Sequence, residues 1–176
     1  MKTDPAPAVF FDRDGTLNID TGYIRDPESL RLFDGVPELI ARVRARGYRV
    51  FVISNQSGLG RGLIRPDEYR NVSRRFLELC GEGSIDEVVY CPHDPSCECE
   101  CRKPQGALVD VLAERFAIDM KRSFFIGDKL SDIACGKRFA MRTIFITHGT
   151  GVFPSSAEET PDYQVKSIAE IDALLP

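Results

Sequence analysis

The chain has 176 residues, of which 43% are hydrophobic and 28% are charged. These values are ordinary for a globular protein, and the length predicts a single domain over residues 1–176. A formal net charge of −4 predicts no basic face for nucleic acid. No apolar run approaches the roughly 20 residues that cross a bilayer, and residues 1–7 hold no apolar signal core. We therefore expect a cytoplasmic protein with no membrane partner, and a monomer, since no segment indicates oligomerisation.

Segments typical of strands and helices alternate along the chain. In order, the pattern predicts a strand at 8–11, a long loop at 17–33, a helix at 37–46, a strand at 49–53, a flexible loop at 58–62, a helix at 66–79, a strand at 85–90, a helix at 105–116, a strand at 123–126, a helix at 130–139, a strand at 143–146, a loop at 147–161 and a helix at 167–175. Helices between strands imply right-handed crossovers and a mostly parallel sheet with helices on both faces, an α/β fold of the Rossmann-like type. No insertion is long enough for a large cap domain.

Polar side chains follow the ends of several predicted strands. They are Asp12 and Asp14 after the first strand, Ser54 and Asn55 after the second, and Asp128 and Asp132 after the fourth, with Arg102 and Lys103 directly before a helix. Because the carboxyl ends of parallel strands share one edge of a sheet, we expect these side chains to converge. Carboxylates suit Mg²⁺, while hydroxyl, amide and ammonium donors suit a phosphate bridged to that ion. An Asp-Gly pair by itself usually marks a turn, but the ordered set predicts phosphoryl transfer to an aspartate nucleophile.

A cluster of cysteines forms a second candidate site. Cys91, His93, Cys99 and Cys101 supply three thiolates and an imidazole within residues 91–101, a common ligand set for structural zinc. In a reducing compartment such a dense cluster indicates a metal site before it indicates disulfides. The predicted zinc loop ends next to Lys103, so the metal would support the position of that lysine.

The ligand choice leaves alternatives open. Cys97 and Cys99 have the same spacing as Cys99 and Cys101, so Cys97 competes as a ligand. Redox cysteines or plain surface thiols are the other interpretation of the cluster. Cys80 and Cys135 fall on predicted helices, where we expect them to be small core residues.

Four motifs, in this order, resemble those of the haloacid dehalogenase superfamily of phosphatases. They are Asp12-Arg13-Asp14-Gly15-Thr16, Ser54-Asn55, Lys103 and Gly127-Asp128-Lys129-Leu130-Ser131-Asp132. The resemblance implies that Asp12 is the nucleophile, and that Asp14 protonates the leaving oxygen and then activates water. It implies that Ser54, Asn55 and Lys103 hold the phosphoryl group. Asp12, the backbone carbonyl of Asp14, and Asp128 would ligate Mg²⁺, and Asp132 would orient Lys103.

The cysteine loop narrows the resemblance to the subgroup that removes the 7-phosphate of D-glycero-D-manno-heptose 1,7-bisphosphate. The segments that carry it include Asn55-Gln56-Ser57-Gly58-Leu59-Gly60-Arg61-Gly62, Cys91-Pro92-His93 and Cys99-Glu100-Cys101-Arg102-Lys103-Pro104. The subgroup implies Cys99 rather than Cys97 as a zinc ligand, and a sugar bisphosphate on the path to activated heptose for lipopolysaccharide. Arg61 and Arg102 are candidates for binding the second phosphate. At residues 105–107 the chain departs from the usual basic or proline-containing run, which bears on substrate and anomer preference.

Two other functions remain open. Histidinol-phosphate phosphatases share these motifs and the zinc loop, but histidinol carries an amine and would need an acid at the remote end of the site. Arg61 favours a bisphosphate instead. A zinc-stabilised binding module without activity is the third interpretation, and the presence of every motif acid favours an enzyme over it.

Overall fold

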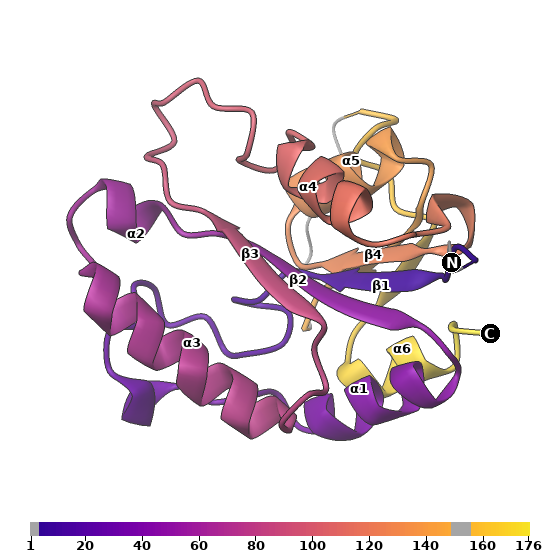
Figure 1. The fold of residues 1–176 in the computed structure, drawn as a ribbon, viewed down its shortest axis with the longest axis horizontal. Helices are drawn as coiled ribbons and strands as arrows, with labels where there is room; N and C mark the ends of the chain where they lie inside the picture. Colours follow the sequence, from indigo (N-terminus) through magenta and orange to yellow (C-terminus); the bar gives the residue numbers. More distant parts are fainter. Residues whose placement is uncertain (1–3, 149–155) are drawn as a thin grey trace.

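The computed structural model describes residues 4–148 and 156–176, and its centre is a six-stranded parallel sheet (Figure 1). The strands are β1 (Ala8–Phe11), β2 (Arg49–Asn55), β3 (Glu87–Cys91), β4 (Phe124–Gly127), β5 (Arg142–Ile146) and β6 (Tyr163–Val165), in the spatial order β3-β2-β1-β4-β5-β6. The helices are α1 (Val36–Ala45), α2 (Ser57–Gly60), α3 (Pro66–Cys80), α4 (Ala107–Arg115), α5 (Leu130–Arg138) and α6 (Ile168–Asp172), with the 3-10 turns η1 (Pro27–Ser29) and η2 (Met120–Arg122). The predicted α/β, Rossmann-like fold is confirmed.

Helices cover both faces of the sheet because successive strand side chains point to opposite faces. In β1, Val9 and Phe11 join a core cluster with side chains of α1, α3 and α6. Ala8 and Phe10 face the other way, into a second cluster with side chains of α4 and α5. Figure 1 shows these two helical layers on opposite sides of the sheet. All four β1 side chains are fully buried, which explains the continuous apolar run in the sequence.

The strand order places a switch point beside β1. From β1 the chain crosses to β2 on one side, and the later strand β4 pairs with β1 on the other side. A crevice opens at the carboxyl edge of such a sheet where the crossovers diverge, and ligands bind there. The ladder extends past β1, since the backbone N–H of Asp12 donates to the carbonyl of Ile126 at 2.9 Å.

Four elements differ from the predicted pattern. The single helical turn α2 overlaps the segment predicted as a flexible loop at 58–62, and the 3-10 turns η1 and η2 and the strand β6 were not predicted. Two of the three side chains of β6 are exposed, so this strand carries no buried apolar run to mark it. The predicted loop at 147–161 lies partly outside the described residues.

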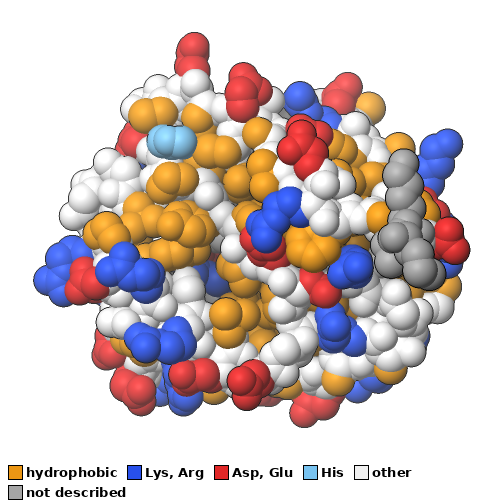
Figure 2. Space-filling model, in the orientation of Figure 1, with side chains coloured by type: hydrophobic (Ala, Val, Ile, Leu, Met, Phe, Trp, Pro, Cys, Tyr) orange, Lys and Arg blue, Asp and Glu red, His pale blue; other side chains and the backbone are white. Residues whose placement is uncertain are grey.

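Apolar side chains are exposed near β3, which is an edge strand. Figure 2 shows hydrophobic side chains gathered on the face that carries α3 and β3. Leu77 of α3 and Tyr90 of β3 are both more than one third exposed and line a shallow groove there. Among the described residues, no helix has the length and apolar character needed to cross a bilayer.

Candidate active site

The main cavity lies at the carboxyl edge of the sheet and has a volume of about 500 Å³. It is lined by residues that follow β1, β2 and β4 and by residues of the loops above them, namely Asp12, Asp14, Asp20, Gly22, Tyr23, Ser54, Asn55, Gln56, Ser57, Gly58, Ile64, Arg102, Lys103, Lys129, Ser131 and Asp132. Most of the phosphatase residues expected from the sequence therefore line one cavity. Convergence follows from the parallel sheet, because every strand delivers its carboxyl end to the same edge.

Lys103 is buried between two carboxylates. Its Nζ lies 2.7 Å from Asp12 Oδ1 and 2.8 Å from Asp132 Oδ1, and it also donates to the carbonyl of Ile53. Burial alone would lower the pKa of the lysine, but the two carboxylates outweigh it and raise the pKa. Burial also raises the pKa of Asp132 to about 6, with Asp12 adding to the rise and Lys103 opposing it. Lys103 is thus held as a cation that points at one oxygen of Asp12.

Asp128 faces the same centre from the end of β4. Thr16 Oγ1 donates to Asp128 Oδ1 at 3.0 Å. Burial, together with the nearby charge of Asp12, raises the pKa of Asp128 to about 7. Gly15 must be glycine here, because its φ is +87° and an added Cβ would overlap the Asp128 carboxylate. The turn after β1 therefore packs directly against the carboxylate of Asp128.

The ammonium of Lys129 lies near the oxygens that are predicted to hold Mg²⁺. Lys129 Nζ is 3.4 Å from the backbone carbonyl of Asp14, 3.9 Å from Asp12 Oδ2 and 3.9 Å from Asp128 Oδ2. Carboxylate and carbonyl oxygens are the ligands that Mg²⁺ prefers. The donor set and its surplus of negative charge therefore fit a divalent cation at this position.

The side chain of Asp14, for which the resemblance implies proton transfer, is held by several hydrogen bonds in this structure. Its carboxylate accepts hydrogen bonds from Arg13 at 2.9 and 3.0 Å, from Asn18 at 3.0 Å and from Gln56 at 2.6 Å. Burial would raise the pKa of Asp14, but the Arg13 guanidinium and these hydrogen bonds lower it. In this conformation Asp14 is an ionised carboxylate, held next to the nucleophile.

The sequence analysis assigned no role to three residues of this network, Arg13, Asn18 and Gln56. Arg13 is almost fully buried and forms a bidentate ion pair with Asp14. Gln56 donates from the same amide nitrogen to Asp14 and to the hydroxyl of Ser54. Their positions carried a signal, since Arg13 stands between the two motif aspartates and Gln56 directly follows Ser54-Asn55.

Asn55 clamps the backbone of Lys103. Its Oδ1 accepts from the N–H of Lys103 at 3.0 Å, and its Nδ2 donates to the carbonyl of Lys103 at 3.1 Å. A carboxamide has two N–H groups on its nitrogen, so one of them is left to face the cavity. Asn55 thus connects the end of β2 to the lysine, 48 residues later in the chain.

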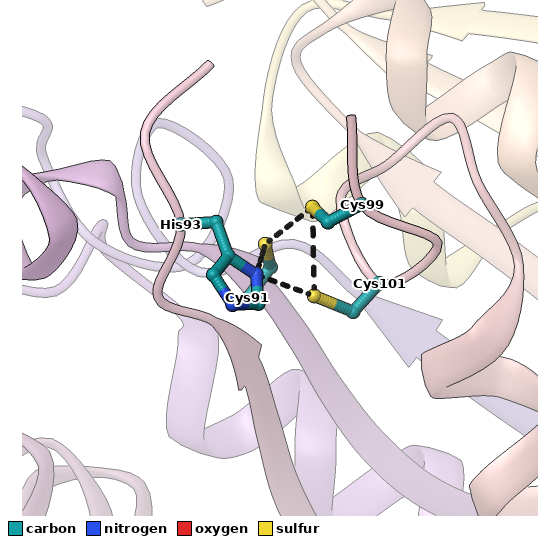
Figure 3. A group of neighbouring side chains, drawn as sticks. All are labelled: Cys91, His93, Cys99 and Cys101. Carbon is teal, nitrogen blue, oxygen red and sulfur yellow. Dashed lines mark hydrogen bonds between the residues drawn. The ribbon is translucent and has the colours of Figure 1, made fainter. Parts of the chain in front are cut away.

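The four residues of the predicted zinc loop converge at the end of β3 (Figure 3). Cys91 Sγ lies 3.6 Å from Cys99 Sγ and 3.6 Å from His93 Nδ1, while Cys101 Sγ lies 3.7 Å from Cys99 Sγ and 3.2 Å from His93 Nδ1. Around a tetrahedral zinc, two sulfur ligands lie about 3.8 Å apart, and a nitrogen and a sulfur about 3.6 Å apart. The observed distances fit that geometry.

The neighbours of this cluster also fit a metal site. Partial desolvation opposes ionisation of Cys99, but the backbone N–H of Arg102 and the surrounding side chains of the cluster lower its pKa to about 7. Desolvation raises the pKa of Cys91, and raises that of Cys101 to about 12. The thiolate is the form that binds zinc. Cys97 is exposed and lies outside the converging group, whereas Cys80 and Cys135 are buried, as expected.

The chain is similar to known phosphatases. The HAD-hydrolase-like family matches residues 100–171. A relative from Photorhabdus laumondii, named D-glycero-beta-D-manno-heptose-1,7-bisphosphate 7-phosphatase, is 34% identical over 179 residues that span 96% of this chain and 95% of the relative. The chain belongs to the family of HAD-like phosphatases.

Two further relatives show the range of this family. A relative from Campylobacter jejuni, named D-glycero-alpha-D-manno-heptose-1,7-bisphosphate 7-phosphatase, is 36% identical over 84% of each chain. Among solved structures, D,D-heptose 1,7-bisphosphate phosphatase from B. bronchiseptica, complexed with magnesium and phosphate, is similar with a TM-score of 0.81 and 24% identity. The similarity covers 96% of this chain and 97% of that one, and it shows the shared fold.

In this HAD-like phosphatase, one arginine ties together the loops around the cavity. Arg61 Nε donates to Asp94 Oδ2 at 2.6 Å, and Arg61 Nη1 donates to the hydroxyl of Tyr23 at 2.9 Å. Tyr23 belongs to the predicted loop at 17–33, and Asp94 follows His93 in the cysteine loop. Of these three residues, only Tyr23 is among those that line the main cavity. Arg61 therefore connects α2 to both neighbouring loops.

The second predicted arginine reaches the cavity itself. Arg102 lines it, and its Nη1 is buried without a hydrogen-bond partner among the described residues. A buried guanidinium nitrogen without a partner carries an unpaid desolvation cost. The guanidinium also places a positive charge at the wall of the cavity.

Proposed function

We propose that this chain is a Mg²⁺-dependent phosphatase that hydrolyses a sugar phosphomonoester through an aspartyl-phosphate. The observation that carries the proposal is the arrangement at Asp12. One of its oxygens is held by Lys103, and the other faces the oxygens that we propose as ligands of Mg²⁺. An oriented carboxylate between two cationic positions is suited to in-line attack on phosphorus, where the main task is to neutralise charge.

The chain supplies each group that the reaction needs. Asp12 attacks phosphorus, and the bond to the leaving sugar oxygen breaks as the aspartyl-phosphate forms. Ser54, Asn55 and Lys103 line the cavity, where they can donate hydrogen bonds to the phosphoryl oxygens. Asp14 protonates the leaving oxygen and then takes a proton from the water that attacks the aspartyl-phosphate. Its ionised state in this structure suits the second of these steps.

Two metal ions complete the proposal. Asp12, Asp128 and the carbonyl of Asp14 would hold Mg²⁺, which supplies positive charge for the phosphoryl group. Cys91, His93, Cys99 and Cys101 would hold zinc, and four protein ligands leave no open position, so this zinc would be structural. The solved relative from B. bronchiseptica, whose name includes magnesium and phosphate, agrees with the first assignment.

The proposed substrate is D-glycero-D-manno-heptose 1,7-bisphosphate, from which the enzyme removes the 7-phosphate to leave heptose 1-phosphate. The relatives named above act on this bisphosphate, some in the alpha and some in the beta form. Arg102 supports a second anion in the cavity, because it lines the cavity and carries a positive charge. We propose Arg102, with Arg61 at the rim, as ligands of the second phosphate. The product keeps its anomeric phosphate, which fits a role in activated-heptose and lipopolysaccharide biosynthesis.

The proposal also covers the oligomeric state, the number of domains and the cellular location. Every group proposed for the reaction comes from one chain, which supports a monomer built as one phosphatase domain. A cytoplasmic location agrees with a small phosphorylated sugar as substrate.

The deciding experiment measures phosphate release from heptose 1,7-bisphosphate by the zinc-loaded protein in the presence of Mg²⁺. We expect turnover by the wild type, and none by Asp12→Asn with its zinc content unchanged. Binding of the sugar without turnover by the wild type would instead support the non-catalytic binding module. A comparison of kcat/KM for heptose bisphosphate and histidinol phosphate separates the two enzymes, and a preference for histidinol phosphate would overturn the proposed substrate.

A further inference from the structure

Lys129 stands in an unusual place for a lysine. It is the residue at the N-terminal cap of α5, where the helix dipole is positive and a cation is disfavoured. Its side chain is half exposed, yet the ammonium turns inward and lines the main cavity. The carboxylates in the cavity, and not the helix, therefore account for its direction.

The ammonium does not form a close pair with any single partner. Its distances to Asp12 Oδ2, Asp128 Oδ2 and Asp20 Oδ2 are 3.9, 3.9 and 3.8 Å, and its shortest contact is 3.4 Å, to a backbone carbonyl. Lys103, by contrast, lies 2.7 and 2.8 Å from its two carboxylates. Lys129 thus has four oxygens around its ammonium at 3.4 to 3.9 Å, well beyond the roughly 2.1 Å of a Mg²⁺–oxygen contact, and three of these oxygens are the proposed magnesium ligands.

The charges around this centre call for one further cation. With Asp12, Asp20, Asp128 and Asp132 ionised, Lys103 neutralises one of four negative charges and leaves three. Lys129 reduces the surplus to two, whereas a divalent ion in its place would reduce it to one. Two cations at the same position would repel each other strongly, since unit charges about 4 Å apart interact by several kcal/mol at a protein surface.

We propose that Lys129 is an internal counter-ion to the proposed magnesium ligands and moves aside when Mg²⁺ binds, so that it lowers the affinity for the metal. This inference rests on the proposed magnesium site. The lysine can leave easily, because its stem is flexible and half exposed. Asp20 offers a partner for the displaced ammonium, since its Oδ1 is used by the N–H of Gly22 and its Oδ2 faces Lys129.

The experiment is a calorimetric titration of the zinc-loaded full chain with MgCl₂ in magnesium-free buffer at about pH 8. The variant Lys129→Met removes the charge and keeps the length of the side chain. A fixed cation at this distance would weaken Mg²⁺ binding by a very large factor, but a mobile one can retreat, so we expect the variant to bind Mg²⁺ about tenfold more tightly. The metal-free variant should also have a lower Tm than metal-free wild type, and a larger rise of Tm on addition of Mg²⁺.

Two further variants sharpen the test. Lys129→Arg keeps the charge and should bind Mg²⁺ like the wild type. Lys121→Met removes the same charge from an exposed residue of η2, at the opposite edge of the sheet, and should leave Mg²⁺ affinity unchanged. If Lys129→Met does not fold, Lys129→Gln supplies the neutral side chain.

The outcomes separate this inference from the proposed function. Unchanged or weaker Mg²⁺ binding by the neutral variants overturns the counter-ion role, whether or not the wild type is active. Tighter binding by Lys129→Met together with a wild type that releases no phosphate supports the counter-ion role and refutes the phosphatase proposal. A wild type that binds no Mg²⁺ overturns both.

Discussion

Lys103 Nζ lies 2.7 Å from Asp12 Oδ1, although the two residues are 91 positions apart in the chain. The contact fixes one oxygen of the carboxylate and leaves the other facing Lys129 and Asp128. It depends on the clamp from Asn55, which holds both peptide groups of Lys103. The orientation of the proposed nucleophile is thus set by a lysine that enters from the end of the cysteine loop.

Replacing this lysine should affect both stability and activity. We expect Lys103→Met to destabilise the metal-free protein by about 3–5 kcal/mol at pH 8, because two buried carboxylates lose their shared cation. The loss should shrink toward pH 5, where Asp132, whose pKa is raised to about 6, becomes protonated. The kcat should fall about 100-fold or more. Urea unfolding at the two pH values and steady-state kinetics provide the measurements.

The matched control for this substitution is Lys121→Met, which removes an exposed lysine at the other edge of the sheet and should change stability by less than about 0.5 kcal/mol. A Lys103→Met protein as stable as wild type at pH 8 would show that the buried ion pairs do not form in solution.

The cysteine cluster gives a prediction with a built-in control. Cys99→Ser should lose bound zinc and lower the Tm, because Cys99 is one of the four converging ligands. Activity should fall as well, since the loop ends next to Lys103. Cys97→Ser should keep the zinc content and Tm of the wild type, because Cys97 is exposed and outside the cluster. Metal content by mass spectrometry shows which cysteine binds zinc. Zinc lost from Cys97→Ser but kept in Cys99→Ser would make Cys97, and not Cys99, the ligand.

Gly60 of α2 contacts the cysteine loop, because its N–H donates to the carbonyl of Pro92 at 2.8 Å. An added Cβ would lie 2.7 Å from the backbone carbonyl of Pro92 and 2.7 Å from the backbone nitrogen of Asp94. We expect Gly60→Ala to cost about 1–3 kcal/mol of stability, and to raise KM more than it lowers kcat, because it pushes apart the loops that Arg61 connects. Denaturant unfolding and kinetics measure the two effects.

Gly62→Ala serves as the comparison. It meets nothing within 4 Å but must adopt a φ of +68°, which costs about 1–2 kcal/mol through backbone strain alone. Its KM should stay near that of the wild type. An equal rise of KM in both variants would mean that the contact of Gly60 with the cysteine loop does not affect substrate binding.

Asp162 anchors the outer strand β6 and gives a pH-dependent prediction. Its Oδ2 accepts from the N–H and the hydroxyl of Thr143 at 2.7 and 2.8 Å. Desolvation would raise the pKa of Asp162, but these hydrogen bonds and Lys137 outweigh it and lower the pKa. Asp162→Asn mimics the protonated acid and should cost about 1 kcal/mol near neutral pH, a modest value because the side chain is 40% exposed.

The sign of the pH effect follows from linkage. A carboxyl whose folded pKa is lowered stabilises the protein above its unfolded pKa of about 3.9, and this stability disappears as the pH falls through the folded value. The urea midpoints of wild type and Asp162→Asn should therefore differ at pH 7 and approach each other below about pH 4. Glu114→Gln, an exposed change on α4, should show no such convergence. A difference that stays constant across the range contradicts the assignment.

The sequence by itself determined the α/β class, the strands that build the site and the residue types at their ends. It could do so because buried parallel strands are marked by apolar runs such as 8–11, and because their carboxyl ends share one edge. It did not indicate β6, whose side chains are mostly exposed. Nor could spacing alone decide whether Cys97 or Cys99 is the zinc ligand. Only the path of the loop after β3 brings Cys99 into the cluster and leaves Cys97 outside it.

Only the tertiary structure decided which atom faces which. Arg13 and Gln56 hold Asp14, Asn55 holds the backbone of Lys103, and the ammonium of Lys129 lies among the proposed magnesium ligands. Motifs give the identity and order of such residues, but contacts between segments far apart depend on strand order and on the direction of each side chain. Both are fixed by packing across the whole sheet, which no local pattern in the chain records.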